Sequence, residues 1–215
     1  MKRLASVIPL LLIFGANALA TPRLFYSKYF KGSVPEFVAI TVERSGQVTY
    51  QEAKDDDNPI HVQMTDSETQ ELFDLAEKLD RFKRPVESGL KVAHMGTKTF
   101  RFEDATEKHE IQFNYSLDTS ATALLDWFER IAETEQDFIN LDRAAHYDKL
   151  GVNDALLLLQ ISLEHKRLVA AQQFLPLLDR VAKNESYLHI ARERASSLAE
   201  AIRKPAPAPQ EKTQP

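Results

Sequence analysis

The sequence contains no cysteine in its 215 residues. This absence excludes disulfide bonds, thiolate zinc sites, iron–sulfur clusters, a thiol nucleophile and a lipidated N-terminal cysteine. Glycine is also scarce, with six residues in the whole chain. None of them follows the GxGxxG or GxxxxGK[ST] spacing that cradles the phosphates of a nucleotide. We therefore expect no cofactor.

Basic residues are outnumbered by acidic ones, with 27 Lys and Arg against 32 Asp and Glu and a net charge of −5. General nucleic-acid binders owe most of their affinity to Lys and Arg on phosphates, so we expect no nucleic-acid partner. Apolar residues make up 43% of the chain, which is too much for a disordered protein. At this length we expect one large or two small domains.

The longest apolar run lies at the N-terminus and is shorter than the roughly 20 residues that span a membrane. A basic start, Lys2-Arg3, precedes the run, and Ala18-Leu19-Ala20 follows it with the small-x-small pattern of a signal-peptidase site. We predict that residues 1–20 are a signal peptide, with Ala18 and Ala20 as the cleavage-site residues and Thr21 as the mature start; an uncleaved anchor is the alternative. Because a cysteine-free exported chain suits bacteria, we expect a periplasmic or secreted protein with no stable membrane span after cleavage.

Residues 21–134 predict an α+β sheet domain. Alternating apolar residues indicate two hairpins, and helical spacing follows each of them, with Thr65 or Asp66 and then Asp118 or Thr119 as N-caps. The order ββαββα favours an antiparallel sheet covered by helices on one side. We expect the other face to carry polar side chains into water: Thr41, Thr49, Lys98, Arg101, Gln112 and Asn114.

Two aromatic pairs stand near the start of the exported chain, Phe25 with Tyr26 and Tyr29 with Phe30. They indicate either an extra edge strand or a segment that lies over the core. An edge strand could also dock a partner by strand addition.

Residues 135–204 carry no strand signals and predict a C-terminal helical region. We expect a stop at Gly151, an N-cap at Asn153 and a break or kink at Pro176. The segment 154–165 is almost wholly apolar, so we expect it to be central to the packing. Residues 205–215, rich in Pro and Ala, predict an extended, disordered tail.

Recognisable catalytic chemistry is sparse. The six His residues show none of the short spacings of a zinc site, and no Ser stands in a GxSxG or SxxK motif. The acidic run Asp55-Asp56-Asp57-Asn58 lacks the alternation and the Gly of a calcium-binding loop. These patterns assign no catalytic residue and no metal ligand.

The least ordinary segment is residues 92–98, directly before a predicted strand. Gly96 permits a backbone turn there, and loops positioned by a sheet often carry sites. We therefore take His94, Lys98 and Arg101 as the candidate binding residues. The alternative is a simple strand entry in which His94 bonds to the backbone.

The hairpin formed by Pro35-Glu36-Phe37-Val38-Ala39-Ile40 and Ser45-Gly46-Gln47-Val48-Thr49-Tyr50 resembles the opening hairpin of small exported bacterial domains of unknown function. The resemblance extends over residues 25–133. Those domains carry a Cys before the Pro, whereas this chain has Gly32-Ser33-Val34. The resemblance implies the fold and export, and it implies no activity.

Together these features favour a non-catalytic exported protein that binds an envelope or secreted protein, or another envelope component. One alternative is an exported hydrolase whose site is assembled from residues distant in sequence. Another is a structural module tethered by its tail.

Overall fold

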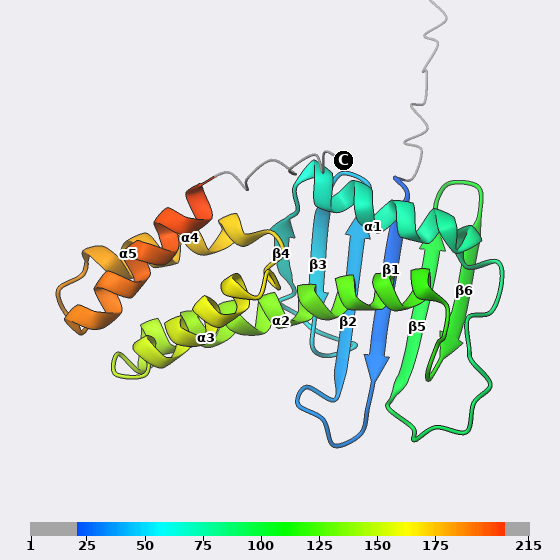
Figure 1. Ribbon diagram of the computed structural model, residues 1–215, viewed down its shortest axis with the longest axis horizontal. Helices are drawn as coiled ribbons and strands as arrows, with labels where there is room; N and C mark the ends of the chain where they lie inside the picture. The colour runs from blue at the N-terminus through cyan, green and yellow to red at the C-terminus, as the bar shows by residue number, and fades with distance from the viewer. Residues whose placement is uncertain (1–20, 205–215) are drawn as a thin grey trace, which may run out of the picture.

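The computed structural model describes residues 21–204. The predicted signal peptide with Ala18 and Ala20, and the predicted tail 205–215, lie outside the described residues. The rest forms a sheet with helices on one face, followed by a helical region, as the sequence predicts (Figure 1).

The sheet has six antiparallel strands in the order β4-β3-β2-β1-β5-β6. Both predicted hairpins are confirmed, as β2–β3 and β5–β6. Strand β4 was not predicted from the sequence, because it is only four residues long. The strands are β1 (Arg23–Tyr29), β2 (Phe37–Glu43), β3 (Gln47–Gln51), β4 (Ile60–Gln63), β5 (Thr97–Glu103) and β6 (Lys108–Phe113).

Strand β1 holds the aromatic residues Phe25 and Tyr26, and it lies in the middle of the sheet. It pairs with β2 on one side and with β5 on the other. The expectation of an edge strand or an overlying segment is therefore wrong. Leu24 and Tyr26 are buried on the helix-covered face, and a central strand brings them under the helices that form the core.

Two helices cross one face of this sheet, α1 (Asp66–Lys78) and α2 (Thr119–Tyr147) (Figure 1). Thr65 caps α1 in a reciprocal capping box with Glu68, and Asp118 caps α2 by accepting the Ser120 and Ala121 amides. The core between helices and sheet contains stacked aromatic rings, with the Tyr26 and Phe128 centroids 4.9 Å apart. A short 3₁₀ turn, η1 (Asp80–Phe82), follows α1.

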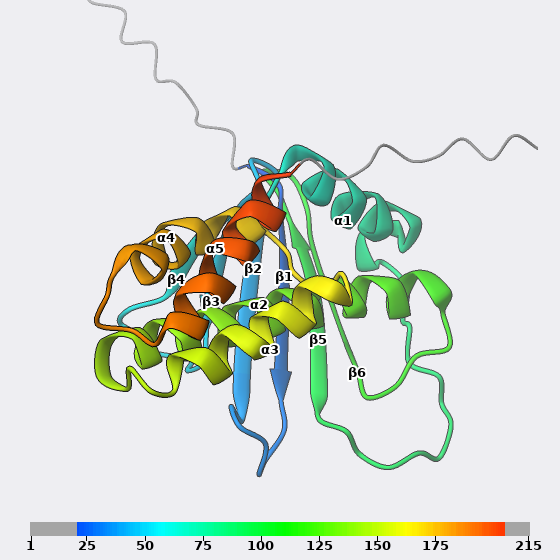
Figure 2. The same ribbon diagram turned by 60° about the vertical axis from the view of Figure 1, so that its left-hand side comes forward.

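The helical region packs around its own apolar cluster, beyond the β4 edge of the sheet (Figures 1 and 2). Helix α2 runs through residue 135 without a break and contributes Ile131 to the sheet core and Leu141 to the helical core. The other elements are α3 (Val152–Glu164), η2 (Ala171–Phe174), α4 (Leu175–Lys183) and α5 (His189–Arg203).

Three details of this region differ from expectation. Helix α3 begins at Val152, so Gly151 rather than Asn153 is the N-cap. Pro176 lies in the first turn of α4, where its missing N–H costs no helical hydrogen bond, so it marks the start of a helix that follows η2 rather than a kink inside a longer helix. Helix α3 buries Leu156 and Leu159 but exposes Leu157, Leu158 and Ile161, because neighbouring helices cover only one side of it.

Candidate functional site

The three residues chosen from the sequence lie on three different surfaces. His94 is exposed in the loop before β5. Arg101 lies on the open face of the sheet, where its guanidinium is 4.0 Å from the Phe25 ring centre. Lys98 lies on the helix-covered face, 6% exposed. The expectation that Lys98 belongs to the open polar face is therefore corrected: it is two residues from the buried Phe100, and side chains two apart in a strand share a face.

The loop around His94 is tied to the end of the sheet by Asn114. The Asn114 side chain accepts a hydrogen bond from the Met95 amide at 2.7 Å and donates one to the Ala93 carbonyl at 3.0 Å. Gly96 has φ +93, and a Cβ at this position would lie 2.9 Å from Phe30 Cβ. The backbone turn expected at Gly96 is thus present, and it places the loop against the end of β1, at Tyr29 and Phe30.

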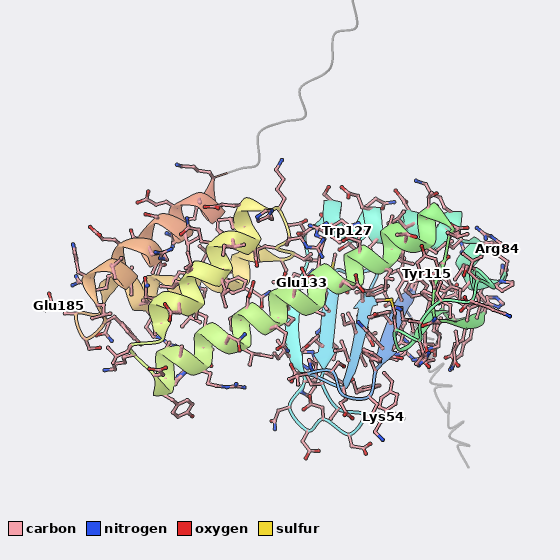
Figure 3. The ribbon with its side chains drawn as sticks, turned by 60° about the horizontal axis from the view of Figure 1, so that its bottom comes forward. Lys54, Arg84, Tyr115, Trp127, Glu133 and Glu185 are labelled. Atoms are coloured by element: carbon pink, nitrogen blue, oxygen red, sulfur yellow. The ribbon has the colours of Figure 1, made fainter. Side chains whose placement is uncertain are left out.

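Beneath α2, at the end of the sheet where β1 passes into β2, the surface is hollowed into what we call the α2 cleft. It consists of two adjoining hollows of about 380 and 200 Å³ that share Lys28 and Glu129. The sheet forms its floor, α2 one wall, and loops the outer rim. Glu133 lies toward one end of the cleft and Tyr115 toward the other (Figure 3). The volume is that of a small-molecule site.

Two lysines form the floor of the α2 cleft at its middle. Lys28 on β1 pairs directly with Lys98 on β5, and both lie in the same register as the buried Tyr26 and Phe100. Lys98 Nζ donates a hydrogen bond to the Asn114 carbonyl at 2.8 Å. Burial, aided by the charge of Lys28, lowers the pKa of Lys98. Like charges placed directly opposite destabilise a sheet, so this pair has a structural cost.

Acidic groups compensate the two ammoniums only in part. Neither lysine forms a salt bridge within residues 21–204. Glu129 on α2 faces them, and burial raises the pKa of its carboxyl despite both positive charges. Glu133 is already bound to Arg167 at 2.8 and 3.1 Å. Glu87 also acts on the charge of Lys98. The two ammoniums therefore have carboxylates near them, but none bound to them within the described residues.

The hydroxyl of Tyr26 also lacks a partner. Tyr26 is 1% exposed, lines the cleft, and its Oη has no hydrogen-bond partner among the described residues. Burial raises its pKa, which keeps the hydroxyl protonated. Buried polar atoms in folded proteins nearly always have a partner, so this unpaired donor is a candidate contact for a ligand.

Sequence reasoning missed Lys28, Glu129 and Tyr26 as site residues. A signal for the lysines was present, since Lys28 and Lys98 each lie two residues from a buried aromatic residue in an alternating strand. A lysine whose side chain lies on the helix-covered face of a sheet is unusual and indicates a polar feature on that face. The position of Glu129 depends on the docking of α2 and had no comparable signal.

Comparisons with known proteins give no family: no protein-family model matches the chain, and no curated protein is significantly similar to it. The resemblance of residues 25–133 to exported bacterial domains stays a prediction. Within residues 21–204, no cluster of three or more His, Asp and Glu side chains could hold a metal ion. No helix in that part of the chain has the length and apolar character needed to cross a membrane.

Proposed function

We propose that this protein is a non-catalytic exported binding protein that holds an anionic component of the cell envelope in the α2 cleft. The observation that carries the proposal is the Lys28–Lys98 pair, two facing ammoniums without a salt bridge on the floor of a cleft. An anion placed between them would relieve their repulsion and add charge-assisted hydrogen bonds.

The export half of the proposal rests on the sequence. The basic start, apolar run and Ala18-Leu19-Ala20 pattern of residues 1–20 support secretion. The lack of cysteine supports a bacterial periplasmic or extracellular location. Outside the cytoplasm nucleotide cofactors are scarce, whereas anionic compounds and surfaces are available as ligands.

The arrangement of hydroxyl groups in the cleft favours binding over hydrolysis. The Ser33 hydroxyl donates to the Phe30 and Pro35 carbonyls, at 2.7 and 2.8 Å. The Ser116 hydroxyl accepts the Asp118 amide. A serine nucleophile needs a general base within hydrogen-bond reach, and in the described part of the chain neither hydroxyl is bonded to Glu129. The hydrolase alternative therefore gains no support.

A comparison of native ligands tests this function. The protein and a Lys28→Gln/Lys98→Met variant are recovered from the cell envelope under native conditions, and small molecules released from each are compared by mass spectrometry. Methionine keeps the length of the buried Lys98 stem, so the fold is preserved; circular dichroism checks this. We expect an anionic compound that the variant loses. Equal recovery of every anionic compound from both proteins contradicts the proposal.

A further inference from the structure

We infer that the ligand of the α2 cleft is an aliphatic carboxylate, with its carboxylate between Lys28 and Lys98 and its chain in the larger hollow, toward Val38 and Ala132. This inference rests on the proposed function and specifies the class of its ligand. The hollow adjoins the lysines directly, because Lys28 belongs to both hollows.

The charge of the cleft favours a ligand with one negative charge over a ligand with two. Lys28 and Lys98 contribute two positive charges, and the carboxylates of Glu129 and Glu87 act against the charge of Lys98. Glu133 is paired with Arg167. A carboxylate adds one negative charge to this balance, whereas a phosphate monoester adds close to two in a partly enclosed site.

Donors of the cleft line both hollows. Lys28 and Tyr26 lie two positions apart on the same face of β1 and line the larger hollow, whereas Lys98 lines the smaller one. A carboxylate has two oxygens and can accept from both lysines at once. A carboxylate oxygen that reaches the buried Tyr26 hydroxyl would also give this unpaired donor a partner, which an apolar ligand group would not.

The rest of the larger hollow combines an apolar part, formed by Val34, Pro35, Val38 and Ala132, with the polar side chains of Ser33, Glu129 and Glu133. Val38 and Ala132 are partly buried and pack against the core, and Pro35 and the fully exposed Val34 form the outer edge. The hydroxyl of Ser33 is used by backbone carbonyls. A peptide would bring an unpaired amide into this space with each residue, at a free-energy cost, whereas a hydrocarbon chain brings none.

Calorimetric titration with octanoate, octanol and octyl phosphate tests the inference. We expect octanoate to bind, and octanol and octyl phosphate to bind about tenfold more weakly or less. Lys28→Gln/Lys98→Met should lose octanoate binding, and Lys78→Gln, a surface change on α1, should retain it. Octyl phosphate binding as tightly as octanoate overturns the carboxylate assignment but leaves an anion-binding function intact. Failure of octanoate to bind also overturns it, and the native-ligand comparison then decides the proposed function separately.

Two bulky substitutions test where the chain lies. Ala132→Phe fills the larger hollow and should weaken octanoate binding by about tenfold or more. Thr122→Phe, an exposed position on the rim of the smaller hollow, should leave it unchanged. Thermal unfolding of both variants checks that they fold. The reverse pattern, with Thr122→Phe blocking and Ala132→Phe neutral, contradicts the placement of the chain.

Discussion

Lys28 and Lys98 face each other across the two central strands β1 and β5, and both side chains lie on the face covered by α2. Neither makes a salt bridge within the described residues, although twelve salt bridges of Lys or Arg with Asp or Glu occur elsewhere in that part of the chain. A pair of this kind opposes folding. Its presence in a cleft is the basis of the predictions that concern binding.

Removing one lysine should stabilise the free protein. Lys28→Gln relieves the cross-strand repulsion, and we expect the free energy of unfolding to rise by up to about 1 kcal/mol. Urea unfolding without ligand measures this change. Lys78→Gln, outside the cleft, should change the stability less. A clear loss of stability in Lys28→Gln would show that the ammonium supports the fold rather than a ligand.

Glu129 should make anion binding depend on pH. Its carboxyl has a raised pKa because it is partly buried, and a bound anion would raise that pKa further. Protonated Glu129 repels the anion less, so octanoate affinity should increase as the pH falls, over the range in which the ligand stays ionised. Glu129→Gln should bind more tightly at pH 8 and show a flatter profile. Weaker binding by Glu129→Gln would assign Glu129 to ligand contact instead.

Glu135 should make stability depend on pH. Glu135 is 1% exposed and lies between α2 and η2. Its Oε1 accepts a hydrogen bond from the Gln173 side-chain amide at 2.9 Å. Its Oε2 has no hydrogen-bond partner among the described residues. Burial raises its pKa from 4.5 to about 7. In the unfolded chain the group ionises at the lower value, so its contribution to stability is complete below that pH and is lost as the pH rises through about 7.

The size of this effect follows from the shift in the Glu135 pKa. The free energy of unfolding should fall by up to about 3 kcal/mol between the two pKa values. Glu135→Gln should remove most of this pH dependence, because the amide stays neutral. Glu71→Gln, exposed on α1, should leave the profile as in the unsubstituted protein. Urea unfolding at several pH values measures the pH dependence of the free energy of unfolding. If this dependence is the same in Glu135→Gln as in the unsubstituted protein, Glu135 is not its source.

Gly96 should tolerate alanine poorly. Gly96 has φ +93, and an added Cβ would lie 2.9 Å from Phe30 Cβ and from the Tyr29 carbonyl oxygen. We expect Gly96→Ala to lower the free energy of unfolding by roughly 2 kcal/mol or more, from backbone strain and from the clash. Gly89→Ala is the matched control, since Gly89 also has positive φ but open space around it. Equal losses in the two variants would show that the contact with Phe30 carries no cost.

Local patterns predicted much of the fold. Each hairpin alternates apolar and polar residues over a short stretch, and the caps at Thr65 and Asp118 are short-range hydrogen bonds. These features depend on residues within about four positions of one another, so they can be read directly from the sequence. The alternation of side chains in β5 also indicates the correct face of Lys98, because Lys98 lies two positions from the buried Phe100 and side chains two apart share a face.

The sequence by itself thus determined the two hairpins, the starts of α1 and α2 and the α+β class, because local hydrogen bonding and side-chain periodicity set them. Only the tertiary structure decided that β1 is central and that α2 passes over Lys28 and Lys98, which are seventy positions apart in the chain. Those choices depend on which distant apolar surfaces pack best together, and no local pattern encodes that comparison. The α2 cleft depends on such long-range contacts, because β1, β5 and α2 each supply part of it.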